Sequence, residues 1–220
     1  HITWPRKWFE VKKILENMKE HFIPFSRYKE ICGQNKVTEK SPQATLLDFL
    51  NDLGIIIYFK DFGLKHMQVL EPRWLTGAVY RIINAPILAE QNGVLQLDSL
   101  EKILDQKIDD NFLYPLSCHS YIVKLMEKFE LCYFIQPGQI LVPDLLDEVE
   151  PQFSWNDDTA LTFIIQYSFL PRSIMPRFIV NRRREIKDNL QWRTGVVLDD
   201  PRFNSTAVVK ADYEARRIYI

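Results

Sequence analysis

Apolar residues recur at three- and four-residue steps over much of the chain, which is the spacing of an amphipathic helix. In the opening segment Trp8, Val11 and Leu15 follow this spacing, with lysines between them. Ser41, directly before a proline, is the expected cap of a later helix, and Gly54 is its expected terminator. The predicted helices cover residues 8–18, 26–32, 42–53, 72–83, 99–104, 118–129 and 171–185.

Short runs of β-branched and aromatic residues lie between these helices and predict strands. The predicted strands cover residues 55–59, 68–70, 93–97, 131–135, 140–142, 161–169, 190–198, 206–211 and 216–220. Helices and short strands mixed in this order indicate an α+β fold. A stretch rich in prolines and acids at 143–158 is a candidate boundary. We therefore predict an α/β domain over 1–150 and a strand-rich domain over 151–220.

Glycine spacing excludes several kinds of catalytic loop. The seven glycines of the 220-residue chain are never closer than nine positions, for example Gly54 and Gly63. The phosphate-binding patterns GxGxxG and GxxxxGK[ST] need two glycines within five positions, and GxSxG fails for the same reason. A nucleotide-hydrolysing loop or a nucleophile elbow is therefore absent from this sequence.

Charge is balanced overall but uneven along the chain. There are 28 Lys and Arg against 29 Asp and Glu, a net charge of −1. Residues 171–220 contain 11 Lys and Arg and 6 Asp and Glu, a net of +5, which leaves −6 for residues 1–170. This asymmetry indicates two modules with different partners, without the global positive field of a typical nucleic-acid binder.

Cysteine and histidine usage indicates neither a disulfide framework nor a metal site. Cys32, Cys118 and Cys132 are odd in number and widely spaced, so we expect free buried thiols in a reducing, cytoplasmic compartment. No CxxC or HExxH pattern occurs, and no serine has His and Asp partners at an identifiable spacing. The longest apolar run, 54–59, is far shorter than the ~20 residues of a membrane span. We expect no catalytic, cofactor-binding or metal-binding residue here.

Several motifs in family order resemble the COR domain of Roco proteins, the region that follows the Ras-like Roc GTPase. The most extensive is LDFLNDLGIIIYF at 47–59, continued by VLEPRWL at 69–75. Further matches are KFELC at 128–132, LVPDLL at 141–146, FLPRSIMPRFIV at 169–180, WRTGVV at 192–197 and ADYEARRI at 211–218. No single motif is specific, but together they cover almost the whole chain. The likeness is to a COR domain of prokaryotic type.

The resemblance implies a winged-helix-like COR-A subdomain followed by the strand-rich start of a COR-B subdomain. It implies a non-catalytic regulatory and dimerisation segment that packs on the protein's own Roc GTPase and forms homodimers through COR-B. The nucleotide state of Roc would then bias how protomers associate. GTP or GDP and Mg²⁺ would belong to Roc and not to this segment. The start and end of the sequence read as cuts in a longer chain.

The turn and strand near residue 66 are the candidate Roc-facing surface, formed by Tyr58, His66, Gln68 and Trp74. Short exposed strands beside a helix start offer edge groups and an aromatic anchor. The alternative is that Tyr58 and Trp74 are ordinary core aromatics. For His66 and Gln68, an interface and plain solvent exposure are both open.

A candidate basic contact patch consists of Arg177, Arg182, Arg183 and Arg184 on the predicted helix at 171–185. It could bind an anion, an acidic partner or nucleic acid. The alternative is a solvated helix end whose cations offset the carbonyl dipole. A rival function is a winged-helix-like nucleic-acid-binding module that uses the basic helix at 171–187. The near-zero net charge, and the lack of aromatics among these arginines, weigh against nucleic acid as a partner.

Overall fold

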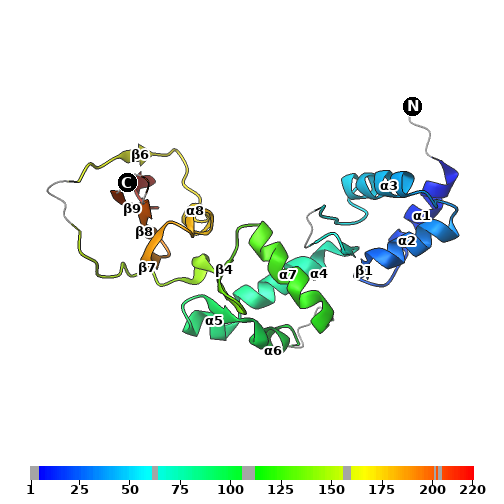
Figure 1. Cartoon of the computed structure of the whole chain (residues 1–220), viewed down its shortest axis with the longest axis horizontal. Helices are drawn as coiled ribbons and strands as arrows, with labels where there is room; N and C mark the ends of the chain where they lie inside the picture. Colours follow the sequence, from blue (N-terminus) through cyan, green and yellow to red (C-terminus); the bar gives the residue numbers. More distant parts are fainter. Residues whose placement is uncertain (1–4, 61–63, 106–111, 156–159, 201, 203–204) are drawn as a thin grey trace. The chain divides into compact units, whose positions relative to one another are not determined.

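The computed structural model describes residues 5–60, 64–105, 112–155, 160–200, 202 and 205–220 (Figure 1). Its helices are α1 (Arg6–Glu16), α2 (Phe25–Gln34), α3 (Lys40–Asp52), α4 (Pro72–Ile83), α5 (Pro86–Glu90), α6 (Leu100–Leu104), α7 (Leu116–Lys128) and α8 (Ile174–Arg182). Its strands are β1 (Phe22–Pro24), β2 (Met67–Val69), β3 (Val94–Gln96), β4 (Tyr133–Gln136), β5 (Gln139–Leu141), β6 (Ile164–Gln166), β7 (Ile186–Trp192), β8 (Gly195–Asp200), β9 (Ser205–Asp212) and β10 (Arg217–Tyr219). The predicted α+β class is confirmed. The winged-helix-like description of the first subdomain stays a prediction.

The chain divides into two compact units that are not continuous in sequence. Unit 1 consists of residues 1–80 and 107–125, and unit 2 of residues 81–106 and 126–220. Helices α4 and α7 each contribute to both units. The predicted domains, 1–150 and 151–220, therefore do not coincide with the two units that pack together.

The core of unit 1 is built by the apolar stripes of its first three helices. Each stripe follows the helical spacing and is buried. The residues are Val11 and Leu15 of α1, Tyr28, Ile31 and Cys32 of α2, and Leu46, Leu47 and Leu50 of α3. The hydroxyl of Tyr28 donates to the carbonyl of Gln43 on α3 at 2.8 Å, so a buried polar group is satisfied within this core.

The predicted end of α3 is confirmed, whereas its predicted start is wrong. Gly54 has φ +69°, and the next amide, that of Ile55, donates back to the carbonyl of Leu50 at 3.0 Å. This is the left-handed helix ending that glycine favours. The helix begins at Lys40 after Glu39, so Ser41 lies inside it and does not cap it.

The strand predicted at 55–59 is wrong except at one residue. Strand β2 pairs antiparallel with β1, with Phe22 opposite Val69. Ile57 reaches the other side of Val69 in a single bridge, with N–O distances of 2.7 and 3.0 Å. Strand β1, which ends in Pro24, is not among the strands predicted from the sequence. Its role as a strand depends on the position of β2, which lies more than forty residues along the chain.

Unit 2 contains a three-stranded sheet in the order β3-β5-β4. The strands predicted at 131–135 and 140–142 correspond to β4 and β5, which pair as an antiparallel hairpin. Gly93, with φ +76°, precedes β3, and a Cβ there would lie 2.5 Å from the carbonyl oxygen of Val142. The amide of Gly93 donates to the carbonyl of Leu88, and the carbonyl of Gly93 accepts from the amide of Val142, at 2.8 Å each. Glycine is therefore required where β3 approaches the chain after β5.

Unit 2 also contains a five-stranded antiparallel sheet in the order β6-β10-β9-β8-β7. The single strand predicted at 190–198 is confirmed as strand except at its centre, where Arg193 and Thr194 form a turn that divides it into the end of β7 and the start of β8. Successive residues of β8 point to opposite faces. Val196 joins a core with Ile179 of α8, whereas Val197 joins a second cluster with Trp192 and Phe153. Both faces of the sheet centre are thus covered.

Gly195 begins β8 directly beneath the buried Trp192 indole. A Cβ at this position would lie 2.6 Å from Cε2 and 2.8 Å from Cη2 of Trp192. We therefore expect Gly195→Ala to lower the free energy of unfolding by roughly 1–3 kcal/mol through overpacking. Denaturant unfolding followed by circular dichroism measures this change. Gly33→Ala is the matched control, because α2 leaves open space there, and it should raise stability by about 0.5–1 kcal/mol. Equal stabilities of the two variants would contradict the close packing at Gly195.

Candidate interaction surfaces

Trp74, a predicted Roc-facing residue, is a core residue with 0% exposure. Its Nε1 donates to the carbonyl of Leu113 at 2.9 Å, and its own carbonyl accepts from the hydroxyl of Tyr114 at 2.7 Å. The ring lies 4.7 Å from that of Phe22 and 5.2 Å from that of Tyr114. A buried indole with its N–H satisfied is typical of a structural residue. The core alternative is therefore the one realised for Trp74.

The other three residues of the predicted Roc-facing surface differ in exposure. Gln68 is 0% exposed, and its side-chain Oε1 has no hydrogen-bond partner in the described structure. His66 is exposed, and its ring meets that of Tyr121 edge-on at 5.8 Å. Tyr58 is half-buried, and its amide donates to Asn51 Oδ1 at 2.8 Å. Burial removes Gln68 and Trp74 from the surface, and a Roc contact stays a prediction for Tyr58 and His66 only.

The predicted basic patch is largely engaged in contacts within its own unit. Arg177 Nε lies 2.6 Å from Glu130 Oε2, and Arg182 Nη1 lies 3.1 Å from Glu185. Arg183 donates to the carbonyl of Val180 at 3.0 Å. Helix α8 ends at Arg182, so Arg183 and Arg184 lie beyond it and the four side chains do not share one helix flank.

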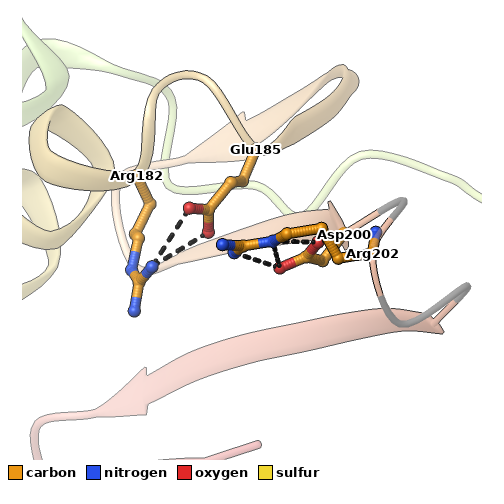
Figure 2. A network of polar contacts seen from close by, with 4 residues as sticks. All are labelled: Arg182, Glu185, Asp200 and Arg202. Atoms are coloured by element: carbon orange, nitrogen blue, oxygen red, sulfur yellow. Dashed lines mark hydrogen bonds and ion pairs between the residues drawn. The ribbon is translucent and has the colours of Figure 1, made fainter.

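Two of these four arginines, Arg177 and Arg182, have acidic partners; Figure 2 shows Arg182 with Glu185 beside a further pair, Arg202 with Asp200. Arg202, with a lesser contribution from Arg182, holds the pKa of Asp200 below its ordinary value. Arg177 does the same for Glu130. Carboxylates held ionised beside the arginines reduce the positive field available to a phosphate backbone. This arrangement weakens the nucleic-acid alternative.

Strand β6 and the residues that flank it carry exposed apolar side chains at one edge of the five-stranded sheet. Leu161, Phe163 and Phe169 are 82%, 61% and 73% exposed, and Ile164 and Ile165 are exposed as well. The backbone groups of residues 163, 165 and 167 point towards β10 and the residues beside it. For example, the amide of Phe163 donates to the carbonyl of Ile220 at 2.8 Å, and the amide of Ile220 donates to the carbonyl of Phe163 at 2.9 Å. By alternation, the backbone groups of Ile164 and Gln166 face outward. An apolar edge with free backbone groups is suited to pairing with another strand.

The described residues give no indication of metal or nucleophilic chemistry. Cys32, Cys118 and Cys132 are free and buried, as predicted. No three His, Cys, Asp or Glu side chains of the described ranges gather as a metal ion would need. Within those same ranges, no helix has the length and apolarity to cross a membrane.

Models of two protein domains match this sequence. "C-terminal of Roc, COR-A domain" matches residues 5–146, and "C-terminal of Roc, COR-B domain" matches residues 158–220. The α+β chain with its strand-rich C-terminal part thus carries a COR-A and a COR-B domain. It belongs to the COR domain family of Roco proteins.

Several proteins resemble the chain over most of its length. The Roc-COR-CHAT protease of Runella zeae is 27% identical over 100% of this chain and 23% of its own length. The probable serine/threonine-protein kinase pats1 of Dictyostelium discoideum is 27% identical over 88% of the chain and 7% of its own length. A solved structure of Methanosarcina barkeri Roco2 RocCORdC bound to GDP is 50% identical, with a TM-score of 0.64 over 66% of this chain and 45% of that one. The chain thus spans less than a quarter of these two curated relatives.

Buried Arg81 on α4 is a structural residue that sequence reasoning missed. Its Nη1 donates to the carbonyl of Leu104 at 2.5 Å and ties the end of α4 to α6. The helical spacing of Trp74, Ala78 and Arg81 would have placed Arg81 on the buried stripe. By contrast, nothing in the sequence predicted that β6 is exposed, because an apolar run of this kind is also typical of a buried strand.

Burial makes two of the three thiols poor nucleophiles. It raises the pKa of Cys118 and Cys132 from 9.0 to about 12 each. At pH 8 we expect Ellman's reagent to label these thiols at least a hundredfold more slowly in the native chain than in guanidinium, because each pKa unit lowers the thiolate fraction tenfold. The raised pKa values also contribute to the free energy of unfolding. This contribution is fully present below pH 9 and is lost as the pH rises toward 12, because in this range the thiols ionise only in the unfolded chain. Rapid labelling of native Cys132 would contradict this.

Proposed function

We propose that this segment is a non-catalytic regulatory and dimerisation domain. It packs on the Roc GTPase of its own protein and couples the nucleotide state of Roc to homodimerisation. The match of COR-A and COR-B models to 5–146 and 158–220 carries this proposal. The Methanosarcina barkeri relative, solved as a RocCOR protein bound to GDP, supports Roc as the partner. GTP, GDP and Mg²⁺ are proposed ligands of Roc, and we place the boundary between the two COR subdomains near residue 150.

The surface around His66 is the part of the predicted Roc contact that remains accessible. His66 follows the buried Leu64 and precedes β2, whose three side chains are all buried. The carbonyl of His66 accepts from the amide of Phe25 at 2.9 Å, which holds the backbone in place. A fixed backbone with an exposed imidazole is a preorganised contact point.

The Roc partnership predicts a feature of the natural gene. The reading frame upstream of His1 should encode a GxxxxGK[ST] motif, because Roc is a Ras-like GTPase. In that longer protein, hydrogen exchange at residues 64–70 should be slower than in the 220-residue chain, because Roc would cover His66. His66→Ala should remove this difference while Lys19→Ala, at an exposed site on another segment, should not. An upstream sequence without the motif would contradict Roc as the partner.

The outer edge of β6 is the surface we propose for dimerisation. It is apolar on both faces, and the backbone groups of Ile164 and Gln166 face outward. Two identical edges can pair antiparallel about a twofold axis, which satisfies those groups and buries Phe163 and Ile164. The buried, ladder-bonded strands β8 and β9 hold the edge in place through β10.

The edge predicts a concentration-dependent dimer. Sedimentation of the 220-residue chain at micromolar to about 100 µM concentration should show dimers. Ile164→Lys should weaken dimerisation at least tenfold, because it places a charge in the paired edge. Leu116→Lys is the matched control: Leu116 is also an exposed apolar residue, but it lies on α7. Equal loss in both variants, or a chain that stays monomeric throughout, would contradict the placement of the dimer contact on β6.

A further inference from the structure

A groove of about 540 Å³ lies between α2 and α3 in unit 1, and we refer to it as the α2–α3 groove. One wall is the α2 stripe of Phe25 and Lys29, four residues apart. The facing wall is a stripe of α3 that starts at Lys40 and continues through Leu47 and Asp48, seven and eight residues later. Residues at these spacings lie on one side of a helix. Tyr58 and Lys60, in the segment that follows α3, close the groove.

The groove carries excess positive charge. Three lysines line it against one acid, Asp48, whose Oδ2 lies 2.9 Å from the ammonium of Lys60. Lys29 and Lys40 form no ion pair with any residue that the structure describes. The ammonium of Lys29 lies over the ring of Phe25, 4.6 Å from its centroid. Lys29 and Lys40 thus remain available, whereas Arg177 and Arg182 of α8 lie in ion pairs.

The floor of the groove is apolar and ordered. Leu47 belongs to the core, and the ring of Phe25 stacks on that of buried Tyr28 with 5.9 Å between centroids. Tyr58 is half-buried and packs against the same core. A floor held by core residues loses little conformational entropy when a ligand covers it. An apolar side chain seated here would lie directly below the lysine ammonium groups.

We propose that the α2–α3 groove binds a short acidic peptide segment that carries one aromatic side chain. The aromatic side chain would occupy the space between Phe25, Leu47 and Tyr58. The flanking carboxylates would pair with Lys29 and Lys40. A groove between two helices with an apolar floor and a charged rim is a common way to recognise peptides. This proposal goes beyond Roc binding and dimerisation, and Tyr58 is the one groove residue that also belongs to the predicted Roc contact.

An extended peptide is favoured over a compact anion because the charges are spread along the groove. Lys29 lies on α2, Lys40 lies at the start of α3, and Lys60 lies beyond its end, already paired with Asp48. A single phosphate needs several donors that converge on one point. Acidic residues on either side of an aromatic anchor fit cations distributed on both walls.

The test is fluorescence anisotropy on the intact 220-residue chain. The probe is a fluorescein-labelled decapeptide of glutamates around one phenylalanine. Replacing its glutamates by glutamines, or its phenylalanine by alanine, should each weaken binding at least tenfold. Raising the salt from about 50 to about 300 mM should also weaken binding, because exposed charges are screened.

Two charge-matched double variants make the assignment specific. Lys29→Gln with Lys40→Gln should weaken binding at least tenfold. Lys13→Gln with Lys19→Gln removes the same charge from exposed positions outside the groove and should leave binding within twofold. Circular dichroism should be identical for both, because all four side chains are exposed.

Three results would overturn the proposal. They are no binding of the acidic peptide at millimolar concentration, equal weakening by both double variants, and equal binding of the glutamine peptide. Phenyl phosphate serves as a small-anion probe. If it binds in a manner that depends on Lys29 and Lys40 while the peptide does not, the groove is a small-anion site instead. A failed peptide result leaves the sedimentation and hydrogen-exchange outcomes unchanged, so the two proposals fail separately.

Discussion

Burial of the Trp74 indole holds together three parts of unit 1 that are distant in sequence. Its ring packs on Phe22 of β1, its N–H bonds the carbonyl of Leu113, and its carbonyl accepts from Tyr114. A buried donor left without an acceptor costs about 1–3 kcal/mol, so the chain before α7 must follow α4 closely. The strand pair β1–β2 and the segment that presents His66 therefore rest on this residue. Trp74 was predicted to contact Roc directly, but it affects the surface only by holding the backbone that presents His66.

In the five-stranded sheet of unit 2, buried and exposed apolar residues have different roles. The centre of the sheet is buried on both faces, with Val196 towards α8 and Val197 towards Trp192. This burial supplies the stability that an exposed edge cannot. Strand β6 contributes apolar surface without burying it, which is a liability in an isolated monomer and an advantage in a protein that pairs with another strand. The proposed dimer contact follows from this contrast.

Charge has a different meaning on the two units. Arg177, Arg182 and Arg202 lie beside carboxylates, so the number of arginines in this part of the chain overstates the positive field that a partner would meet. The lysines of the α2–α3 groove are fewer, yet two of them are not engaged in ion pairs. Formal charge per segment pointed to residues 171–220 as the basic module. The arrangement of side chains leaves available cations in the acidic first part of the chain as well.

The sequence by itself determined the family, the α+β class, most helices and the glycine that ends α3. These features depend on local periodicity, on turn chemistry and on motifs that neighbouring residues carry. Only the tertiary structure decided that Trp74 and Gln68 are core residues, that β1 is a strand, and that residues 190–198 fold back at Arg193. It also decided which cations lie beside acids and which apolar strand stays exposed. Each of these depends on what a distant segment places opposite a residue, and hydrophobic pattern alone does not specify that partner.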